Sequence, residues 1–297
     1  MTQQTLEQAQ TLEEALTLTP GEGGVLTADV TTDFSNAPLA MEPTKGAPFG
    51  GLMAALAARA ARDALGVTTP LQTLTVQYLA AARFEAVNFE ATMLRGGRNV
   101  SYASVMGGQP GRPALSALAT FGSVNDGAQV KPLKPSATPF LDLEPDFKDL
   151  DPADAPHGFS PPWFTRYIER RFDGGHGLFA RKTLDDPTLR LWMRTADRQP
   201  LDELRLCFLL DGIYPSYFTV LPFPPIISAS VDLRYDFIEP LTPDVSPEGW
   251  AIFEFTVRDV GGGWALDDGL AYAPDGRPLA LARQRRKLAP QRPARPD

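Results

Sequence analysis

The sequence predicts an α+β protein built from two similar halves. Three observations favour this fold class: each half contains one strongly apolar helical run, four strand-like runs follow each helical run, and short matches recur between the halves at nearly constant spacing. With 297 residues, of which 43% are hydrophobic and 22% charged, the chain is long and apolar enough for two such modules with a sizeable core.

The first half is expected to open with a short helix and a strand. Thr11 and Glu14 form the Thr-x-x-Glu pattern of a capping box, which predicts a helix that continues to about Leu18. The run PGEGG at 20–24 would end this helix, and a strand is expected at 25–34.

An Ala-rich helix is the central element of the first half. The turn GAPFGG at 46–51 leads into LMAALAARAARDAL, which contains neither Gly nor Pro and is long enough for about four turns. Glycine-containing turns at 96–97 and 107–111 separate strand-like runs that follow the helix. The four expected strands are 71–79, 87–94, 99–107 and 114–121.

A Pro- and Asp-rich segment, 123–162, separates the halves and is predicted to be a linker. The predicted repeats are therefore 1–122 and 163–289, followed by a tail at 290–297 that is expected to be disordered. In the second half, strands are expected at 163–172, 189–194, 227–237, 250–260, 265–273 and 278–288, with a helix at 201–218 and hairpin turns at 261–263 and 274–276.

The two halves also share short sequence matches. FEAT at 89–92 corresponds to FEFT at 253–256, an offset of 164 residues (253 − 89). GRP at 111–113 recurs at 276–278, an offset of 165 residues (276 − 111). One such match could arise by chance, but several at nearly one offset, within the same order of elements, indicate a duplicated module.

The predicted helix at 201–218 carries a carboxylate on its apolar side. Asp211 lies on the apolar stripe, four residues after Cys207. A buried Asp is costly unless it is hydrogen-bonded or paired. Asp211 is therefore either a residue that caps or orients the backbone at the end of the helix or a functional acid, and the residues alone leave both interpretations open.

Composition argues against several classes of function. The net charge of −8 disfavours nucleic-acid binding, and the single cysteine, Cys207, cannot form a disulfide within the chain. We expect a buried, inert thiol there, because His157 and His176 offer no obvious base; neither stands in a metal-binding spacing, so no metal is expected. The sequence shows neither a secretory signal nor a membrane-spanning run, which makes a cytoplasmic location the expectation.

Several longer stretches carry a family resemblance. FGGLMAALAARA, TLTVQYLAAAR and NVSYASVMGGQPGRPALSALATF resemble the first half of the TesB-like acyl-CoA thioesterases. LLDGIYPS, SASVDLRYDF and YAPDGRPLALARQ resemble their second half, and the closing pattern of Asp-Gly-Arg, an apolar strand and a Gln is the most specific piece. The resemblance implies a double hot-dog fold, in which two tandem repeats each wrap an antiparallel sheet around a long helix.

The resemblance also implies a reaction and its catalytic residues. Members of the family hydrolyse acyl-CoA thioesters with a water held by an Asp, a hydroxyl and a Gln, which carry over to Asp211, Ser230 and Gln284. Thr is commoner than Ser in the family, and Ser228 is an alternative source of the hydroxyl. Burial would raise the pKa of Asp211 toward the range of a general base. The expected partner is a small-molecule acyl-CoA, and no cofactor is implied.

The same residues have ordinary structural explanations. Alternation along 278–288 places Gln284 on a face with small residues, where it could simply meet solvent. Alternation places Ser230 on the same face as Asp232, opposite the apolar Leu233, so a solvated strand face would explain it equally well. The basic run at 283–287 could contact the phosphates of coenzyme A or form a solvated strand end.

The acyl chain is expected to lie in an apolar channel between helix and sheet, and backbone N–H groups near the start of a helix could hold the oxyanion. The first-half position that matches Gln284 is 119 (284 − 165), which is Ala119, so one site per chain is expected. The predicted substrate-binding residues are Phe208, Tyr214, Phe218, Gly50 and Gly51.

Two alternatives from other classes stay open on the same scaffold. One is a non-catalytic acyl-group binding protein, and the other is a hydratase or dehydratase, although that chemistry usually pairs an acid with a His and no suitable His is visible. Because exposed sheet edges invite pairing between chains, a homo-oligomer, specifically a dimer of double hot-dogs, is also expected.

Overall fold

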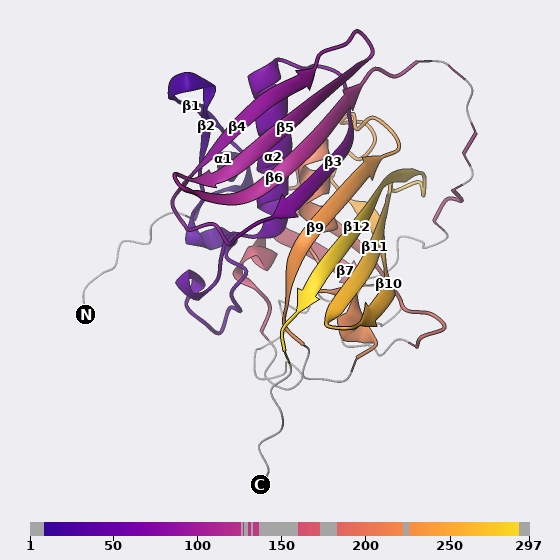
Figure 1. The fold of residues 1–297 in the computed structure, drawn as a ribbon. Helices are drawn as coiled ribbons and strands as arrows, with labels where there is room; N and C mark the ends of the chain where they lie inside the picture. Colours follow the sequence, from indigo (N-terminus) through magenta and orange to yellow (C-terminus); the bar gives the residue numbers. More distant parts are fainter. Residues whose placement is uncertain are drawn as a thin grey trace.

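One antiparallel sheet unites the two halves (Figure 1). The computed structural model describes residues 9–125, 127, 130–131, 133–136, 160–172, 183–221 and 226–290. Within them, twelve strands follow the order β1-β2-β4-β5-β6-β3-β9-β12-β11-β10-β8-β7. The first-half elements are α1 (Leu12–Ala15), β1 (Thr19–Pro20), β2 (Leu26–Asp29), α2 (Gly50–Leu65), β3 (Leu71–Tyr78), β4 (Ala86–Arg95), β5 (Val100–Gln109) and β6 (Arg112–Gly122). The second-half elements are β7 (Ile168–Phe172), β8 (Thr188–Thr195), α3 (Glu203–Leu210), β9 (Ser228–Phe237), β10 (Ala251–Gly261), β11 (Trp264–Tyr272) and β12 (Pro278–Leu288).

The sheet order is symmetrical about its centre. β3 of the first half pairs with β9 of the second, and each step outward from this pair meets corresponding strands of the two halves. This symmetry agrees with the predicted duplication, while the boundaries proposed for the two repeats stay predictions. Because β3 and β9 cover each other's edges, β1 and β7 are the two outer edges of the sheet, and β1 has only two residues and ends in Pro20. Fewer and shorter sheet edges are therefore available for pairing between chains than the sequence suggested.

The two helices pack against each other on the inner side of the sheet. α2 lies behind β4, β5 and β6 in Figure 1, and most of its residues are buried. A Cβ added to Gly51 would come within 2.8 Å of the carbonyl oxygen of Phe208 in α3, so the glycine permits this close approach. Phe208 in turn meets the ring of Phe49 edge-on at 5.0 Å. The small alanine side chains of α2 thus suit a helix that is enclosed by the sheet on one side and by α3 on the other.

Several predicted elements are shorter than expected. α3 ends at Leu210, because Gly212 and Pro215 interrupt the helix predicted to reach 218; a 3-10 turn follows at Ser216–Thr219. The predicted strand at 25–34 ends at Asp29, and the strand predicted from 163 starts only at Ile168. Both missing stretches contain 3-10 turns, Thr32–Phe34 and Trp163–Tyr167. Most of the predicted linker and all but the first residue of the predicted tail lie outside the described residues.

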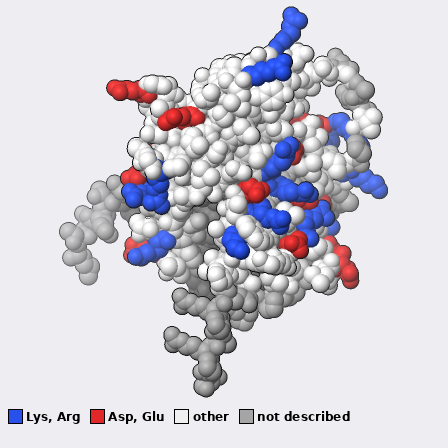
Figure 2. Space-filling view, viewed as in Figure 1, with Lys and Arg blue, Asp and Glu red and all other residues white. Residues whose placement is uncertain are grey.

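The outer face of the sheet differs between the two halves (Figure 2). Over the first half, the exposed side chains include Tyr102, Met106 and Leu118, which surround Ser104 on adjacent strands. Over the second half, charged side chains gather in ion pairs, such as those of Asp268 with Arg258 and Arg283. In the described part of the chain, no helix combines the length and apolar character needed to cross a membrane.

Candidate active site

The inward face of β9, β11 and β12 carries a group of buried polar side chains beside the end of α3. Burial along β12 alternates, so that Ala282, Gln284 and Arg286 face inward and Arg283 faces outward. Gln284 is 5% exposed and therefore does not lie on a solvated face. The alternation read from the sequence correctly placed Gln284 with the small residues of the inner side.

A β-bulge brings Ser230 to this inward face. Asp232 pairs with Arg285, yet Ser230 pairs with the next residue, Arg286, so Val231 is an extra residue in β9. An inserted residue reverses which side of the sheet the preceding residues face. Strict alternation would have placed Ser230 on the outside with Asp232; instead it lies with Leu233 on the inside, and its hydroxyl meets Gln284.

Asp211 is the C-cap of α3, and its carboxylate lies against the start of α2. A Cβ built on Gly50 would be 2.7 Å from Asp211 Oδ2, and Tyr78 holds this turn by donating a hydrogen bond of 2.9 Å to the Gly50 carbonyl oxygen. The backbone N–H of Gly51 also stabilises the ionised carboxylate. The two predicted substrate-binding glycines therefore lie against Asp211. Asp211 ends α3 and is 7% exposed, which agrees with the capping interpretation and is compatible with a functional acid.

Asp211, Ser230 and Gln284 form one hydrogen-bonded group. Gln284 Nε2 donates to Asp211 Oδ1 at 2.8 Å and to Ser230 Oγ at 2.7 Å. Since both acceptors lie within hydrogen-bond distance of the same nitrogen, one water molecule could bridge them. The structure thus brings together three residues that are far apart along the chain.

The environment of Asp211 shifts its acidity. Burial raises the pKa of Asp211 because the ionised form loses its hydration. Arg286, whose Nη2 lies 3.8 Å from Asp211 Oδ1, and the hydrogen bonds from Gln284 and Gly51 oppose this rise without cancelling it. A carboxyl group with a raised pKa, held next to a hydroxyl and an amide, is suited to accept a proton from a bound water near neutral pH.

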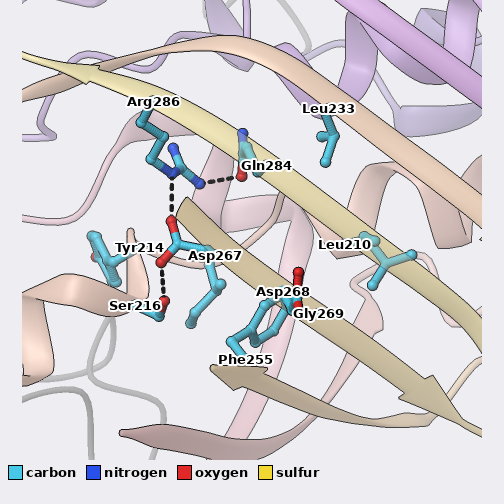
Figure 3. Close-up of a pocket in the computed structure, with 12 residues that line it drawn as sticks. Leu210, Tyr214, Ser216, Leu233, Phe255, Asp267, Asp268, Gly269, Gln284 and Arg286 are labelled. Carbon is cyan, nitrogen blue, oxygen red and sulfur yellow. Dashed lines mark hydrogen bonds and ion pairs between the residues drawn. The ribbon is translucent and has the colours of Figure 1, made fainter. Parts of the chain in front are cut away.

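Three further polar residues extend the group, and sequence reasoning missed their role. Arg286 Nη2 donates to Gln284 Oε1, and Arg286 Nε donates to Asp267 Oδ2 at 3.2 Å (Figure 3). The Ser216 hydroxyl donates to the other oxygen of Asp267. The signal was available for Arg286: the alternation that places Gln284 inside also places the residue two positions later inside.

A small cavity adjoins this group (Figure 3). Its volume is about 10 Å³, enough for one water molecule. Of the three aromatic residues expected along an acyl channel, Tyr214 lines the cavity, Phe218 stacks on Tyr214 at 6.3 Å, and Phe208 is fully buried in the core. The cavity is lined by Leu210, Ile213, Tyr214, Ser216, Leu233, Phe255, Asp267, Asp268, Gly269, Ala282, Gln284 and Arg286.

The corresponding place in the first half is apolar. Ala119 pairs with Leu74 and Ala103, as Gln284 pairs with Leu233 and Asp267. Phe121 pairs with Leu71 beside a register shift in β3, as Arg286 pairs with Ser230 beside the bulge in β9. The first-half counterparts of Gln284, Asp267, Arg286 and Ser230 are therefore the buried residues Ala119, Ala103, Phe121 and Leu71.

Other chemistry finds little support in the described residues. They contain no cluster of three or more His, Cys, Asp or Glu that could hold a metal ion. His157 and His176 lie outside them. Cys207 is buried, and burial raises the pKa of its thiol, which disfavours the reactive thiolate.

Replacing Gly50 with Ala is expected to displace the Asp211 carboxylate. Alanine normally favours a helix, but here its Cβ would lie 2.7 Å from Asp211 Oδ2, so the carboxylate must move. We expect the turnover rate to fall by about 10-fold or more if Asp211 acts in catalysis. The control is Gly261→Ala, whose Cβ would meet only Asp259 Oδ1 at 3.9 Å. Equal rates in the two variants would contradict the expectation.

Two protein-family models together match most of the chain. Residues 37–122 match the family model described as the acyl-CoA thioesterase N-terminal domain, and residues 145–285 match that of the acyl-CoA thioesterase C-terminal domain. No match was found among curated proteins.

Solved structures of similar fold span nearly the whole chain. A conserved protein of unknown function with a hot dog fold from Alicyclobacillus acidocaldarius has a TM-score of 0.79 at 20% identity, covering 95% of this chain and 98% of its own. The acyl-CoA thioesterase II TesB2 of Mycobacterium marinum has a TM-score of 0.71 at 18% identity, covering 96% and 99%. The tesB protein of Mycobacterium avium subspecies paratuberculosis has a TM-score of 0.67 at 18% identity, covering 94% and 98%. The predicted double hot-dog fold is confirmed.

Proposed function

Because the chain belongs to the TesB-like acyl-CoA thioesterase family, we propose that it hydrolyses an acyl-CoA thioester to a free acid and coenzyme A at the Asp211–Gln284–Ser230 group. The observation that carries this proposal is the pair of hydrogen bonds by which one Gln284 nitrogen joins the carboxylate and the hydroxyl. Fold similarity alone would not suffice, because one fold can host different chemistries.

The hydrogen bonds define how a water would be held. Ser230 Oγ accepts hydrogen bonds from Gln284 Nε2 and, at 3.3 Å, from Arg286 Nη1, which leaves its own proton to be donated. A bridging water would accept that proton as a hydrogen bond and donate one of its own to Asp211. Its remaining lone pair is then free to attack the thioester carbon.

The reaction follows from this arrangement. The water oxygen bonds to the carbonyl carbon while Asp211 takes the released proton. Collapse of the tetrahedral intermediate breaks the carbon–sulfur bond and expels the thiolate, whose pKa near that of free cysteine, about 8.5, makes a general acid unnecessary. Asp211 then returns its proton to solvent or to the thiolate. The cavity, of about 10 Å³, has room for the attacking water but not for an acyl chain, so the acyl-binding channel stays a prediction.

A panel of acyl-CoA substrates from acetyl to palmitoyl tests the proposal. Free thiol released by the purified protein would be measured with a thiol reagent, and direct binding of the same compounds by calorimetry. We expect release of coenzyme A from at least one chain-length class. Tight binding without release would instead identify the non-catalytic acyl-binding protein, and neither binding nor release would refute both.

A second copy of the chain is the partner that we propose for the outer face of the first half. Two chains of net charge −8 repel each other, so contact is least costly where side chains are uncharged. Tyr102, Met106 and Leu118 provide such an apolar surface, 40%, 45% and 55% exposed, on a sheet face that a second sheet face can cover. Leu118→Arg is expected to convert a dimer to a monomer in light scattering, with Arg258→Met as the control; a monomeric wild type would contradict the proposal.

A further inference from the structure

Arg286 donates hydrogen bonds to three polar side chains of the candidate site. Its Nη2 donates to Gln284 Oε1, and its Nε donates to Asp267 Oδ2 at 3.2 Å (Figure 3). Its Nη1 donates to Ser230 Oγ at 3.3 Å. The residue is 8% exposed. Its side chain therefore does not extend to solvent, where the basic run of the sequence could have met phosphate groups.

The guanidinium determines which way the Gln284 amide faces. An amide can be turned so that either its oxygen or its nitrogen faces a neighbour, and only the nitrogen can donate to a carboxylate. Arginine has no acceptor, so of the two amide atoms of Gln284 only Oε1 can bond to Arg286 Nη2. With the oxygen held there, both Nε2 protons face Asp211 and Ser230, as the two hydrogen bonds require.

Arg286 is itself held in place. Asp267 accepts from Arg286 Nε and receives the Ser216 hydroxyl on its other oxygen, and both residues are nearly fully buried. Enclosing a charged pair is costly, and well-packed apolar residues often serve a core equally well or better. The first half shows this directly, because Phe121 and Ala103 occupy the corresponding places. The fold does not need an ion pair there.

We propose that Arg286 is a positioning residue, supported by Asp267 and Ser216, that fixes the Gln284 amide and the Ser230 hydroxyl in the orientation that holds the attacking water. The expected kinetic effects rest on the proposed thioesterase function, whereas the orientation of the Gln284 amide can be measured independently of it.

Kinetic measurements distinguish the positioning of Gln284 by Arg286 from the effect of the Arg286 charge on Asp211. Arg286→Met removes both, and we expect a fall of about 10- to 100-fold in kcat with little change in KM. It also removes a cation that stabilises ionised Asp211, so the pKa of Asp211 rises further and the acid limb of the pH–rate profile moves to higher pH. Arg286→Lys keeps the charge but cannot reach three partners at once; we expect a lower kcat with the acid limb close to that of wild type.

Two further variants control for loss of the fold and for an unspecific effect of removing an arginine. Arg286→Phe combined with Asp267→Ala copies the first-half pair and leaves no unpaired buried carboxylate, so its fold is expected to survive with the same kinetic loss. Arg234→Met removes an arginine from the outer face, where it pairs with Asp236, and should keep wild-type kinetics. Wild-type kcat and an unshifted acid limb in a folded Arg286→Met protein would overturn the proposal.

A readout that needs no turnover distinguishes this inference from the proposed function. The side-chain amide protons of Gln284, followed by ¹⁵N NMR, are expected to exchange slowly with solvent in the wild type and faster in Arg286→Met. That result in a protein without thioesterase activity would uphold the positioning of Gln284 while refuting the proposed reaction. Unchanged exchange in the variant would overturn the positioning role whatever the activity.

Discussion

Replacing Asp211 with Asn is expected to lower kcat by about 1,000-fold without unfolding the protein. Asn is nearly the same shape and keeps an oxygen that can accept the 2.8 Å hydrogen bond from Gln284 Nε2, but it cannot take a proton from water. Loss of a general base commonly costs between about 100-fold and 10,000-fold. The measurement is thiol release under saturating acyl-CoA. Full activity in this variant would remove Asp211 from the mechanism.

The same substitution should change how stability depends on pH. Because burial raises the pKa of Asp211 in the folded state, the fold favours the protonated form, and the stability this confers at low pH is lost as the pH rises through the raised pKa. Asn resembles the neutral form at every pH. The melting temperature of Asp211→Asn relative to wild type should therefore increase from acid to neutral pH.

A matched control isolates the buried carboxylate. Asp236→Asn removes a carboxylate from the outer face of β9, where it pairs with the half-exposed Arg234. Surface ion pairs contribute little, so this variant should keep both its activity and its melting temperature within small limits. A melting temperature of Asp211→Asn that fell further below that of wild type as the pH rose would mean that the charged carboxylate stabilises the fold, contrary to the expectation.

The architecture was largely predictable because it depends on patterns that repeat. Strand alternation, glycine-containing turns and the offset between FEAT and FEFT all recur, and each strand from β3 to β6 and from β9 to β12 appears within a few residues of its expected place. The errors lie where a local break overrides periodicity. Apolar residues continue past Leu210, but Gly212 and Pro215 stop the helix, leaving Asp211 as a cap whose side chain faces α2.

The site was only partly predictable because two of its features are not periodic. Strict alternation would have turned Ser230 outward. The residues around Val231 carry no signal that indicates the β-bulge, which turns Ser230 inward. The predicted roles of Ser230 and Gln284 came from a family resemblance. Arg286 belongs to a basic run, and an arginine in such a run is ordinarily expected to meet solvent or phosphate groups. Alternation places Arg286 on the inner side with Gln284, but its buried partner Asp267, on the neighbouring strand, becomes apparent only in the structure.

Replacing Gln284 with Ala is expected to lower kcat by about 100-fold with a modest effect on the fold. The variant loses the one nitrogen that joins Asp211 to Ser230, so the two groups that hold the water are no longer fixed relative to each other. The backbone should tolerate the change, because Ala119 already occupies the corresponding position of β6. Gln77→Ala, at an exposed position of β3, serves as the control and should keep full activity.

Gln284→Glu distinguishes a lost hydrogen bond from lost volume. Glu fills the same space and can still accept from Arg286, but its ionised form cannot donate to Asp211 and places a second negative charge beside it. Like charges in one site raise the pKa of one partner, so the acid limb of the pH–rate profile should move to higher pH than in wild type. With Gln284→Ala, removal of a hydrogen bond that favours ionised Asp211 shifts the limb in the same direction. If both variants kept the wild-type kcat and pH–rate profile, Gln284 would have no part in catalysis. The water could then not be held in the way that the two hydrogen bonds imply.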